Sequence, residues 1–413
     1  MKAASHEPSA LPAEAQSPVP AAPKRLMSLD ALRGFDMFWI VGGEGIIHGL
    51  ADAYPESPFF KFLRGQVTHK AWAGFAFYDL IFPLFIFIVG VSLVFSLSRM
   101  LERDGRSRTL KRIVFRTIFL YVCGLLVYGG ISQGVDQVRW MGVLQRIAIC
   151  YGFTAILFCL FRLRGLVVIC VSLLLGYWAV TSLVPIRDFN LQTARLQRAG
   201  VTPRSPETRA LFLATTNLVR GRFEDGLNLP QQIDFQYLPG RKWDGAYDPE
   251  GILSTFPAIA TCLLGVFAGR LLRNRTVAEQ KKVWLLIGWG MGGVIAGFAW
   301  GVQFPVIKKI WTSSFVLVAG GYSCLLLGAF YQIVEIWQWR RWCTPFVWIG
   351  TNAITIYLAA HVVPMEKVAE LFVGGPLKQA FGAWGEFLVA ATVVGIMLAF
   401  VRFLYQRKIF LRF

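Results

Sequence analysis

The residues best suited to chemistry in this sequence are His69 and Asp79, which lie ten positions apart at the start of a strongly apolar segment. Only four histidines occur in the chain. An imidazole is the side chain whose ordinary pKa best suits proton transfer near neutral pH. A nearby carboxylate can fix its tautomer and stabilise its charged form. The pair therefore predicts acid–base chemistry at a membrane surface, with His69 as the base and Asp79 as the group that orients it.

Long apolar stretches dominate the chain. Hydrophobic residues make up 55% of the 413 residues and charged residues only 16%, whereas soluble domains usually carry about 25% charged residues. A helix of about 20 residues crosses the hydrocarbon of a bilayer and satisfies its own backbone polar groups. The strands of a membrane barrel would instead alternate over about 10 residues. We therefore predict an all-α polytopic membrane protein with about ten transmembrane helices, at 34–50, 79–98, 113–131, 143–161, 166–185, 251–272, 283–303, 314–337, 344–364 and 386–405.

Positive charge gathers in alternate short connections between these predicted helices. The net charge is +18, but its distribution argues against a nucleic-acid partner, because cytoplasmic loops of membrane proteins carry an excess of Lys and Arg. The pattern predicts that these loops and both termini lie in the cytoplasm, beside the lipid bilayer. Binding of a cofactor or of anionic lipid is a secondary interpretation. The basic segments are 99–112, 162–164, 270–282, 340–341 and 407–412.

The chain divides into three parts by composition. Residues 1–25 are rich in Ala, Pro, Ser and Glu and lack the apolar core of a signal peptide, so we expect a disordered cytoplasmic tail. Residues 26–413 form the predicted transmembrane domain, and within it 186–250 form an extracytoplasmic cap loop. The seven cysteines include no CxxC pair, which favours packing roles and predicts neither disulfides nor a metal site.

Further polar side chains fall at the outer ends of the predicted helices. A polar group at this depth needs a partner or a wet cavity, so we expect a substrate cavity beside His69. For Arg146 two interpretations are open: its cation extends to the surface, or it faces a cavity shared with Glu44 and Asp79. His48, His361 and Lys308 lie at the same face, and the two histidines are interpreted as structural. The candidate cavity residues are Glu44, Trp72, Arg139, Arg146, Asp248, Glu250 and Asn352.

Two short motifs also have a purely structural interpretation. Asp248 and Pro249 suit the N-cap and first position of a helix, where Glu250 would complement the helix dipole. Arg33 and Asp36 are spaced i,i+3 and can pair at the inner surface. The alternative for the first motif is that its carboxylates project into the outer cavity.

The order of the motifs resembles that of the heparan-alpha-glucosaminide N-acetyltransferase family, in its bacterial form, over residues 26–413. The Leu29–Gly34 start alone is shared with other membrane acyltransferases, whereas the full set is specific. The matching motifs are Leu29-Asp30-Ala31-Leu32-Arg33-Gly34, His69-x-x-Trp72-x-Gly74 with Asp79-Leu80-Ile81-Phe82-Pro83, Val138–Arg146, Tyr247–Leu253, Leu264–Gly269, Trp311-Thr312-Ser313-Ser314 and Arg407-Lys408-Ile409-Phe410.

The resemblance implies an acyltransferase that moves an acetyl group from cytoplasmic acetyl-CoA to an amino sugar across the membrane. His69 matches the family's active-site histidine and Asp79 the acidic residue after it, while Glu44 stands where lysosomal members have an Asn. Arg33 and the basic inner loops could hold the CoA phosphates. Arg146 or Asn352 could stabilise the oxyanion. The resemblance also implies a homodimer in the bacterial inner membrane.

Two other functions fit the same composition. A transporter or permease for an amino sugar or cell-wall fragment also needs many helices and charged groups within the membrane. A membrane scaffold without catalysis would leave the grouping of Glu44, His69 and Asp79 unexplained.

Overall fold

The computed structural model describes residues 26–410 and consists almost entirely of helices, so the tail predicted at 1–25 lies outside the described residues. Within the described part, seven helices are long and apolar enough to cross a membrane, or eight spans if one bent pair is counted. The predicted all-α polytopic membrane fold is thereby confirmed. The seven are α4 (Phe77–Val127), α5 (Val143–Leu160), α6 (Leu163–Leu183), α10 (Thr255–Arg273), α11 (Glu279–Gly301), α12 (Ser313–Tyr331) with η3 (Gln332–Ile336), and α17 (Gly385–Gln406) with η4 (Gly382–Trp384).

Helix α4 contains two predicted spans and reverses between them. A straight helix of 51 residues would be about 75 Å long, more than twice the thickness of the hydrocarbon. At Gly105 the backbone leaves the helical region, with φ 75° and ψ 174°. Asp79 at one end lies 3.7 Å from Lys308, and Lys308 and Tyr128 at the other end both lie within electrostatic reach of Glu250. Both ends of α4 therefore reach one face, and the basic segment predicted as a loop is the helical turn of a hairpin.

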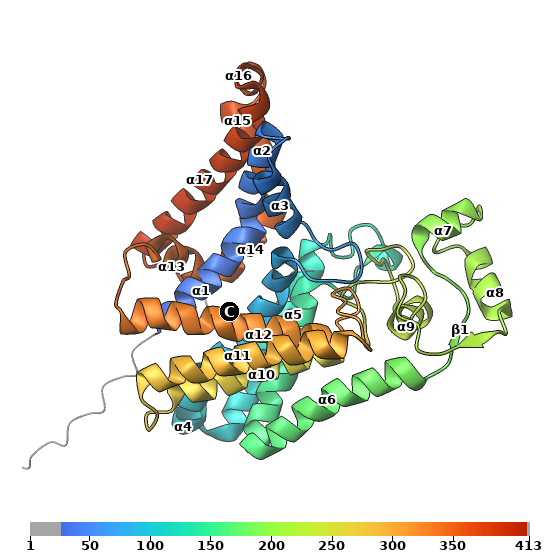
Figure 1. Cartoon of the computed structure of the whole chain (residues 1–413), viewed down its shortest axis with the longest axis horizontal. Coiled ribbons are helices and arrows are strands. Elements are labelled where there is room, and N and C mark those ends of the chain that lie inside the picture. The colour runs from blue at the N-terminus through green and yellow to red at the C-terminus, as the bar shows by residue number, and fades with distance from the viewer. Residues whose placement is uncertain (1–25, 411–413) are drawn as a thin grey trace, which may run out of the picture.

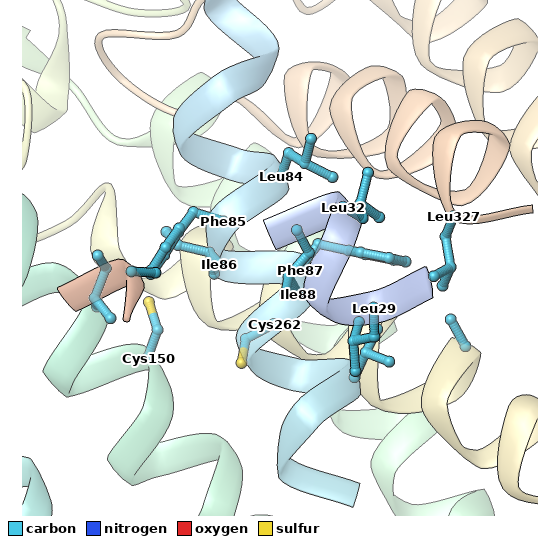
Figure 2. Close-up of a cluster of buried hydrophobic side chains, with 14 of the residues drawn as sticks. Leu29, Leu32, Leu84, Phe85, Ile86, Phe87, Ile88, Cys150, Cys262 and Leu327 are labelled. Atoms are coloured by element: carbon cyan, nitrogen blue, oxygen red, sulfur yellow. The ribbon is translucent and has the colours of Figure 1, made fainter. Parts of the chain in front are cut away.

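The core forms where α4 packs against α10 and α5. Figure 2 shows leucine, isoleucine and phenylalanine side chains of α1 and α4 interdigitating there. Two glycines permit this approach: a Cβ at Gly90 would lie 2.0 Å from the carbonyl oxygen of Cys262, and one at Gly265 2.0 Å from that of Phe87. Small residues at such crossings let membrane helices pack backbone against backbone.

Two helical segments are interrupted near the same polar region. The first runs through α1 (Met27–Phe38), η1 (Trp39–Gly43) and α2 (Glu44–Ala53), with Gly42 at φ 136°. The second bends by 76° between α13 (Thr344–Thr351) and α14 (Ala353–Val362). They pack against each other where a Cβ at Gly34 would meet the carbonyl oxygen of Phe346 at 1.7 Å. The predicted span 34–50 is thus a broken helix.

The segment between α6 and α10 has its own small apolar clusters around Phe212 and Leu229. Figure 1 shows it at one end of the long helices. Its two short strands pair antiparallel, with Ile186 opposite Val219. Its elements are β1 (Ile186–Arg187), α7 (Thr193–Arg198), α8 (Pro206–Ala214), β2 (Leu218–Val219) and α9 (Leu229–Tyr237).

The remaining short helices flank α2 and α17. Figure 1 shows α2, α3, α15, α16 and α17 projecting together from the main bundle. Helices α2 and α17 contact each other, and α15 packs on α17. The bounds of the short helices are α3 (Pro58–Gln66), η2 (Val135–Gln137), α15 (Met365–Val373) and α16 (Pro376–Ala380).

Candidate active site

The imidazole of His69 and the carboxylate of Asp79 are in direct contact. Asp79 lies in the first turn of α4, and its Oδ1 is 2.9 Å from Nδ1 of His69. The other oxygen of Asp79 accepts the backbone N–H groups of Lys70 at 3.3 Å and Ala76 at 3.1 Å. Because Asp79 is only 1% exposed, the carboxylate is fixed in place. It favours the tautomer with the proton on Nδ1 of His69, which leaves Nε2 as an acceptor.

Lys308 completes this group from a distant part of the chain. Its Nζ lies 3.0 Å from Nδ1 and 3.2 Å from Nε2 of His69. Backbone pairing positions it: Ala73 and Ile307 form an antiparallel bridge, and Gly74 donates its N–H to the carbonyl of Val306 at 2.9 Å. The sequence placed Lys308 at the outer face without giving it a role. Its position just before α12 was the only available signal.

Burial lowers the pKa of Lys308 to about 8, although Asp79, Glu250 and Glu44 act in the opposite direction. The side chain keeps 21% of its exposure, and that of His69 keeps 50%. A small molecule can therefore reach the pair from outside. The three side chains combine a base, a carboxylate that orients it and an amine with a lowered pKa, which is an arrangement suited to acyl transfer.

Two aromatic residues hold the loop that carries His69. The ring of His69 packs on Tyr78 with centroids 4.6 Å apart. Trp72 donates its Nε1–H to the carbonyl of Phe223 at 2.7 Å, which ties the loop to the layer between α6 and α10. Trp72 therefore lies in the loop that carries His69, with its indole N–H bonded to the cap loop.

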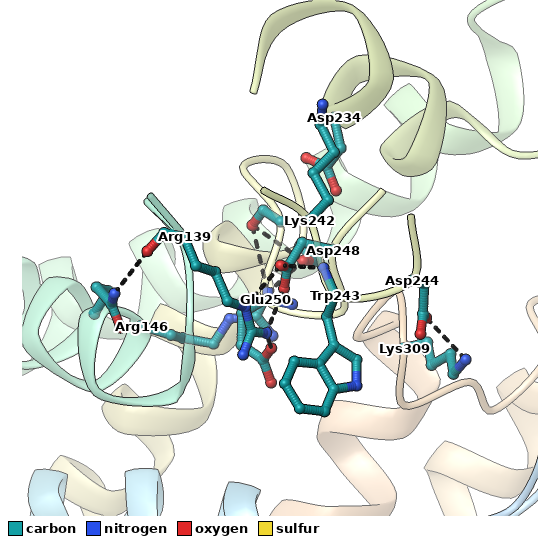
Figure 3. A network of polar contacts seen from close by, with 12 residues as sticks. Arg139, Arg146, Asp234, Lys242, Trp243, Asp244, Asp248, Glu250 and Lys309 are labelled. Carbon is teal, nitrogen blue, oxygen red and sulfur yellow. Dashed lines mark hydrogen bonds and ion pairs between the residues drawn. The ribbon is translucent and has the colours of Figure 1, made fainter. Parts of the chain in front are cut away.

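Arg139, Asp248 and Glu250 form a buried ion-pair cluster, which Figure 3 shows in the turn before α10. Arg139 donates from Nε and Nη2 to the two oxygens of Asp248 at 2.9 and 2.7 Å, and from Nη2 to Glu250 at 2.6 Å. Its guanidinium also lies over the rings of Tyr128 and Trp243. Burial and the nearby Asp248 raise the pKa of Glu250 to about 7. Arg139, Asp248 and Glu250 therefore contact one another, and their place in a substrate cavity stays a prediction.

The expected capping role of this motif is wrong. Helix α10 begins at Thr255, after Ser254, so Asp248 and Pro249 precede it by several residues. Asp248 accepts the backbone N–H groups of Trp243 and Glu250 in a turn, in addition to Arg139. The buried ion pair, worth several kcal/mol when one partner is lost, outweighs a cap worth about 1 kcal/mol.

Arg146 is fully buried in the first turn of α5, so the surface-reaching interpretation is wrong. Its Nη2 donates to the hydroxyl of Ser254 and, at 3.4 Å, to the carbonyl of Gly251. Its guanidinium lies 4.9 Å from the ring centroid of Trp311. Its Nε and Nη1 have no hydrogen-bond partner within residues 26–410. Arg146 thus contacts the start of α10 and Trp311.

Glu44 and Asn352 both lie at helix interruptions. Glu44 begins α2 and is within electrostatic reach of Lys308 and Glu366. Asn352, which is buried, separates α13 from α14. The structure therefore brings Glu44 toward the His69 group and places Asn352 at a bend.

The expected pair of Arg33 and Asp36 is not formed. Arg33 instead bonds Asp30 at 3.3 Å, the carbonyl of Gly350 at 3.2 Å and the hydroxyl of Ser92 at 2.6 Å. Asp36 is fully buried, and its carboxylate has no hydrogen-bond partner among the described residues.

A cavity of about 1620 Å³, called the inner cavity below, lies between α4, α10, α11 and α12 near the turn of α4. Its lining combines apolar residues such as Leu264 and Leu317 with basic side chains and two carboxylates. Glu102 pairs with Arg273, and Glu279 pairs with Lys282. Arg33 is not among its lining residues. The cationic residues of the cavity are Arg99, Arg270, Arg273, Arg275 and Lys282.

Residues 25–212 match the family model described as heparan-alpha-glucosaminide N-acetyltransferase, catalytic. The chain is similar to heparan-alpha-glucosaminide N-acetyltransferase of Homo sapiens, at 26% identity over 94% of this chain and 60% of the human protein. It is similar to the Mus musculus protein of the same name at 26% identity, over 83% of this chain and 56% of the mouse protein. The chain thus matches less than two thirds of the length of these relatives.

Proposed function

We propose that this chain is an acyltransferase of the heparan-alpha-glucosaminide N-acetyltransferase kind, whose catalytic family model matches residues 25–212. It moves an acetyl group from cytoplasmic acetyl-CoA to the amine of an amino sugar on the extracytoplasmic side. The observation that carries this proposal is the contact of His69 with buried Asp79. An imidazole held in this way, with half its side chain exposed, can take a proton from an entering amine.

Two chemical routes use the same residues. In the direct route, Nε2 of His69 takes the proton from the acceptor amine as nitrogen attacks the thioester carbonyl. In the covalent route, Nε2 accepts the acetyl group first and then passes it to the amine. In both, Asp79 orients the ring and stabilises the imidazolium. Acetyl-enzyme formed stoichiometrically on His69 without acceptor would exclude a purely direct route.

The inner cavity is the proposed donor site. The negative phosphates of a CoA thioester suit the cations of its lining, among them Arg270 and Arg273. Its apolar lining suits an extended thioester arm. Arg33 remains a proposed ligand of the CoA phosphates. It donates to the hydroxyl of Ser92, which lies two positions before the cavity residue Val94.

The acceptor cavity is proposed around the polar residues at the opposite end. Arg146 and Asn352 are the proposed donors to the oxyanion. The other proposed wall residues are Glu44, Trp72, Arg139, Asp248 and Glu250.

We further propose the membrane, the oligomeric state and the orientation of the protein. The protein would lie in a bacterial inner membrane as a homodimer, with its termini in the cytoplasm and residues 186–250 outside. The basic residues of the inner cavity support this orientation.

The second candidate function, a transporter for an amino sugar or cell-wall fragment, is favoured by one specific observation. Two interrupted helical segments pack together, and discontinuous helices often form transporter binding sites. A transporter would move the sugar without acetyl-CoA and would not depend on His69 as a base.

The deciding experiment measures acetyl transfer from labelled acetyl-CoA to glucosamine by the purified full chain. We expect His69→Ala to lose about 100-fold or more in rate, because general-base catalysis contributes about 10²–10⁴-fold. His361→Ala is the matched control, since Nδ1 of His361 lies against the carbonyl of Tyr357 in its own helix. Equal rates for His69→Ala and the wild type would remove His69 from the mechanism. Donor-independent uptake into vesicles, without transfer, would favour the transporter.

A further inference from the structure

Two adjacent lysines face different partners in the segment before α12. Lys308 points to His69, with Nζ within 3.2 Å of both ring nitrogens. Lys309 points the other way and forms an ion pair with Asp244 at 2.9 Å. Figure 3 shows this second pair at the edge of the cap loop. The two lysines are neighbours in the sequence, and their side chains are 21% and 34% exposed. They therefore differ chiefly in the groups that they contact.

Lys308, His69 and Asp79 have the geometry of a nucleophile, its base and the acid that orients the base. Nζ of Lys308 lies 3.0 Å from Nδ1 and 3.2 Å from Nε2 of His69, so the amine lies against the imidazole whose Nδ1 contacts Asp79. These are distances at which a base takes a proton from an attacking group. The amine of Lys308 therefore occupies the position that an acceptor amine needs in order to give its proton to His69.

We propose that the ε-amino group of Lys308 occupies the position of the acceptor amine, and that His69 directs acetylation of Lys308 by an acetyl thioester when no acceptor is bound. This inference rests on the proposed function, and it assigns Lys308 as an internal competitor of the acceptor and as a modification site.

The reaction balances without another reagent. The Lys308 ammonium first loses one proton to solvent, which is favoured because burial lowers its pKa to about 8. The neutral nitrogen attacks the thioester carbonyl, so a C–N bond forms and the C–S bond breaks. The second amine proton passes to Nε2 of His69 and then to the leaving thiolate, giving acetyl-lysine and a free thiol.

The product is an end point. An amide does not return its acetyl group to a sugar, in contrast to an acetyl-imidazole. Acetylation also removes the cation beside Asp79, where Nζ now lies 3.7 Å from Oδ1, and fills the space at Nε2 of His69. The enzyme would therefore lose activity when it meets donor without acceptor, and an acceptor amine must displace Lys308 to react.

The test uses the purified full chain with ¹³C-labelled acetyl-CoA and no acceptor, followed by peptide mass spectrometry at Lys308 and Lys309. We expect Lys308 to be labelled about 100-fold faster than Lys309, in keeping with general-base assistance. The label should resist neutral hydroxylamine, which removes acetyl groups from imidazole. In His69→Asn the two lysines should be labelled at similar slow rates, and glucosamine should protect Lys308 in the wild type.

A second measurement guards against a variant that fails to fold. Lys308→Arg keeps the charge and removes the acetylatable amine, so it should resist the loss of activity caused by incubation with donor alone, whereas Lys309→Arg should lose activity like the wild type. Equal labelling of both lysines, or unchanged labelling in a folded His69→Asn, would overturn the inference. Transfer to glucosamine without label on Lys308 would overturn it and leave the proposed function standing. If no acetyl group reaches an amino sugar and no label appears on Lys308, both the inference and the proposed function are overturned.

Discussion

The imidazole of His69 contacts two groups of opposite charge: Asp79 at Nδ1, and Lys308, whose Nζ lies within 3.2 Å of both ring nitrogens. The carboxylate is the part that sequence could predict, because it follows the histidine by ten positions in one motif. Lys308 is 239 positions away and reaches the ring only through the bridge between Ala73 and Ile307. A side chain placed by long-range backbone pairing leaves no local pattern in the sequence.

At the residue scale, the lowered pKa of Lys308 predicts a pH dependence. Labelling of Lys308 by acetic anhydride should rise with a midpoint near pH 8, well below the value of about 10.4 for an ordinary lysine. In Asp79→Asn the midpoint should move to lower pH, because the carboxylate favours the charged amine. Labelling is read by mass spectrometry across pH 6–11. A midpoint near pH 10.4 in the wild type would contradict the partial burial of this amine.

At the element scale, glycines allow the helices to pack closely, and breaks in the helices occur near the polar residues. Helix α4 reverses at Gly105, and the α1–α2 segment breaks at Gly42, just before Glu44. The late start of α10 has a different cause, because Asp248 is engaged by Arg139 in the preceding turn. Local capping preferences predicted an earlier start, and a buried ion pair from another segment overrode them.

The contact of α4 with α10 predicts a stability difference between two glycines. Gly90→Ala should destabilise the protein by about 1–3 kcal/mol, the usual cost of overpacking, because its Cβ would lie 2.0 Å from the carbonyl of Cys262. Gly176→Ala in α6 is the control, since a Cβ there would meet nothing within 4 Å. Thermal unfolding in detergent measures both. An unchanged melting temperature for Gly90→Ala would mean that these helices are further apart than described.

At the scale of the whole molecule, two sites lie at opposite ends of one bundle. The basic cavity opens beside the turn of α4 and the C-terminal end of α10, while His69 lies beside the segment that precedes α12. Such an arrangement suits a donor and an acceptor on different sides of a membrane. The cavity reaches Leu317 in α12, the helix that follows the segment carrying Lys308.

This arrangement predicts the accessibility of two exposed arginines. A cysteine in place of Arg220, in the cap loop, should react with a membrane-impermeant maleimide in intact cells. A cysteine in place of Arg106, beside the turn of α4, should react only after the cells are permeabilised. Both positions are exposed, so a difference reports sidedness rather than burial. The chain without either substitution is the control for its own cysteines. Labelling of position 106 in intact cells would reverse the proposed orientation.

The sequence by itself determined the membrane fold, the approximate limits of most long helices and the pairing of His69 with Asp79. These follow from apolar length and from short-range spacing, which act within one segment. Only the tertiary structure decided that Lys308 joins the histidine, that Arg146 is buried against Trp311, and that Arg33 bonds Asp30 and Ser92 rather than Asp36. The partner of a buried charge is chosen by which segments pack side by side, because desolvation makes any nearby counter-charge or hydrogen-bond partner more favourable than a local one that faces elsewhere.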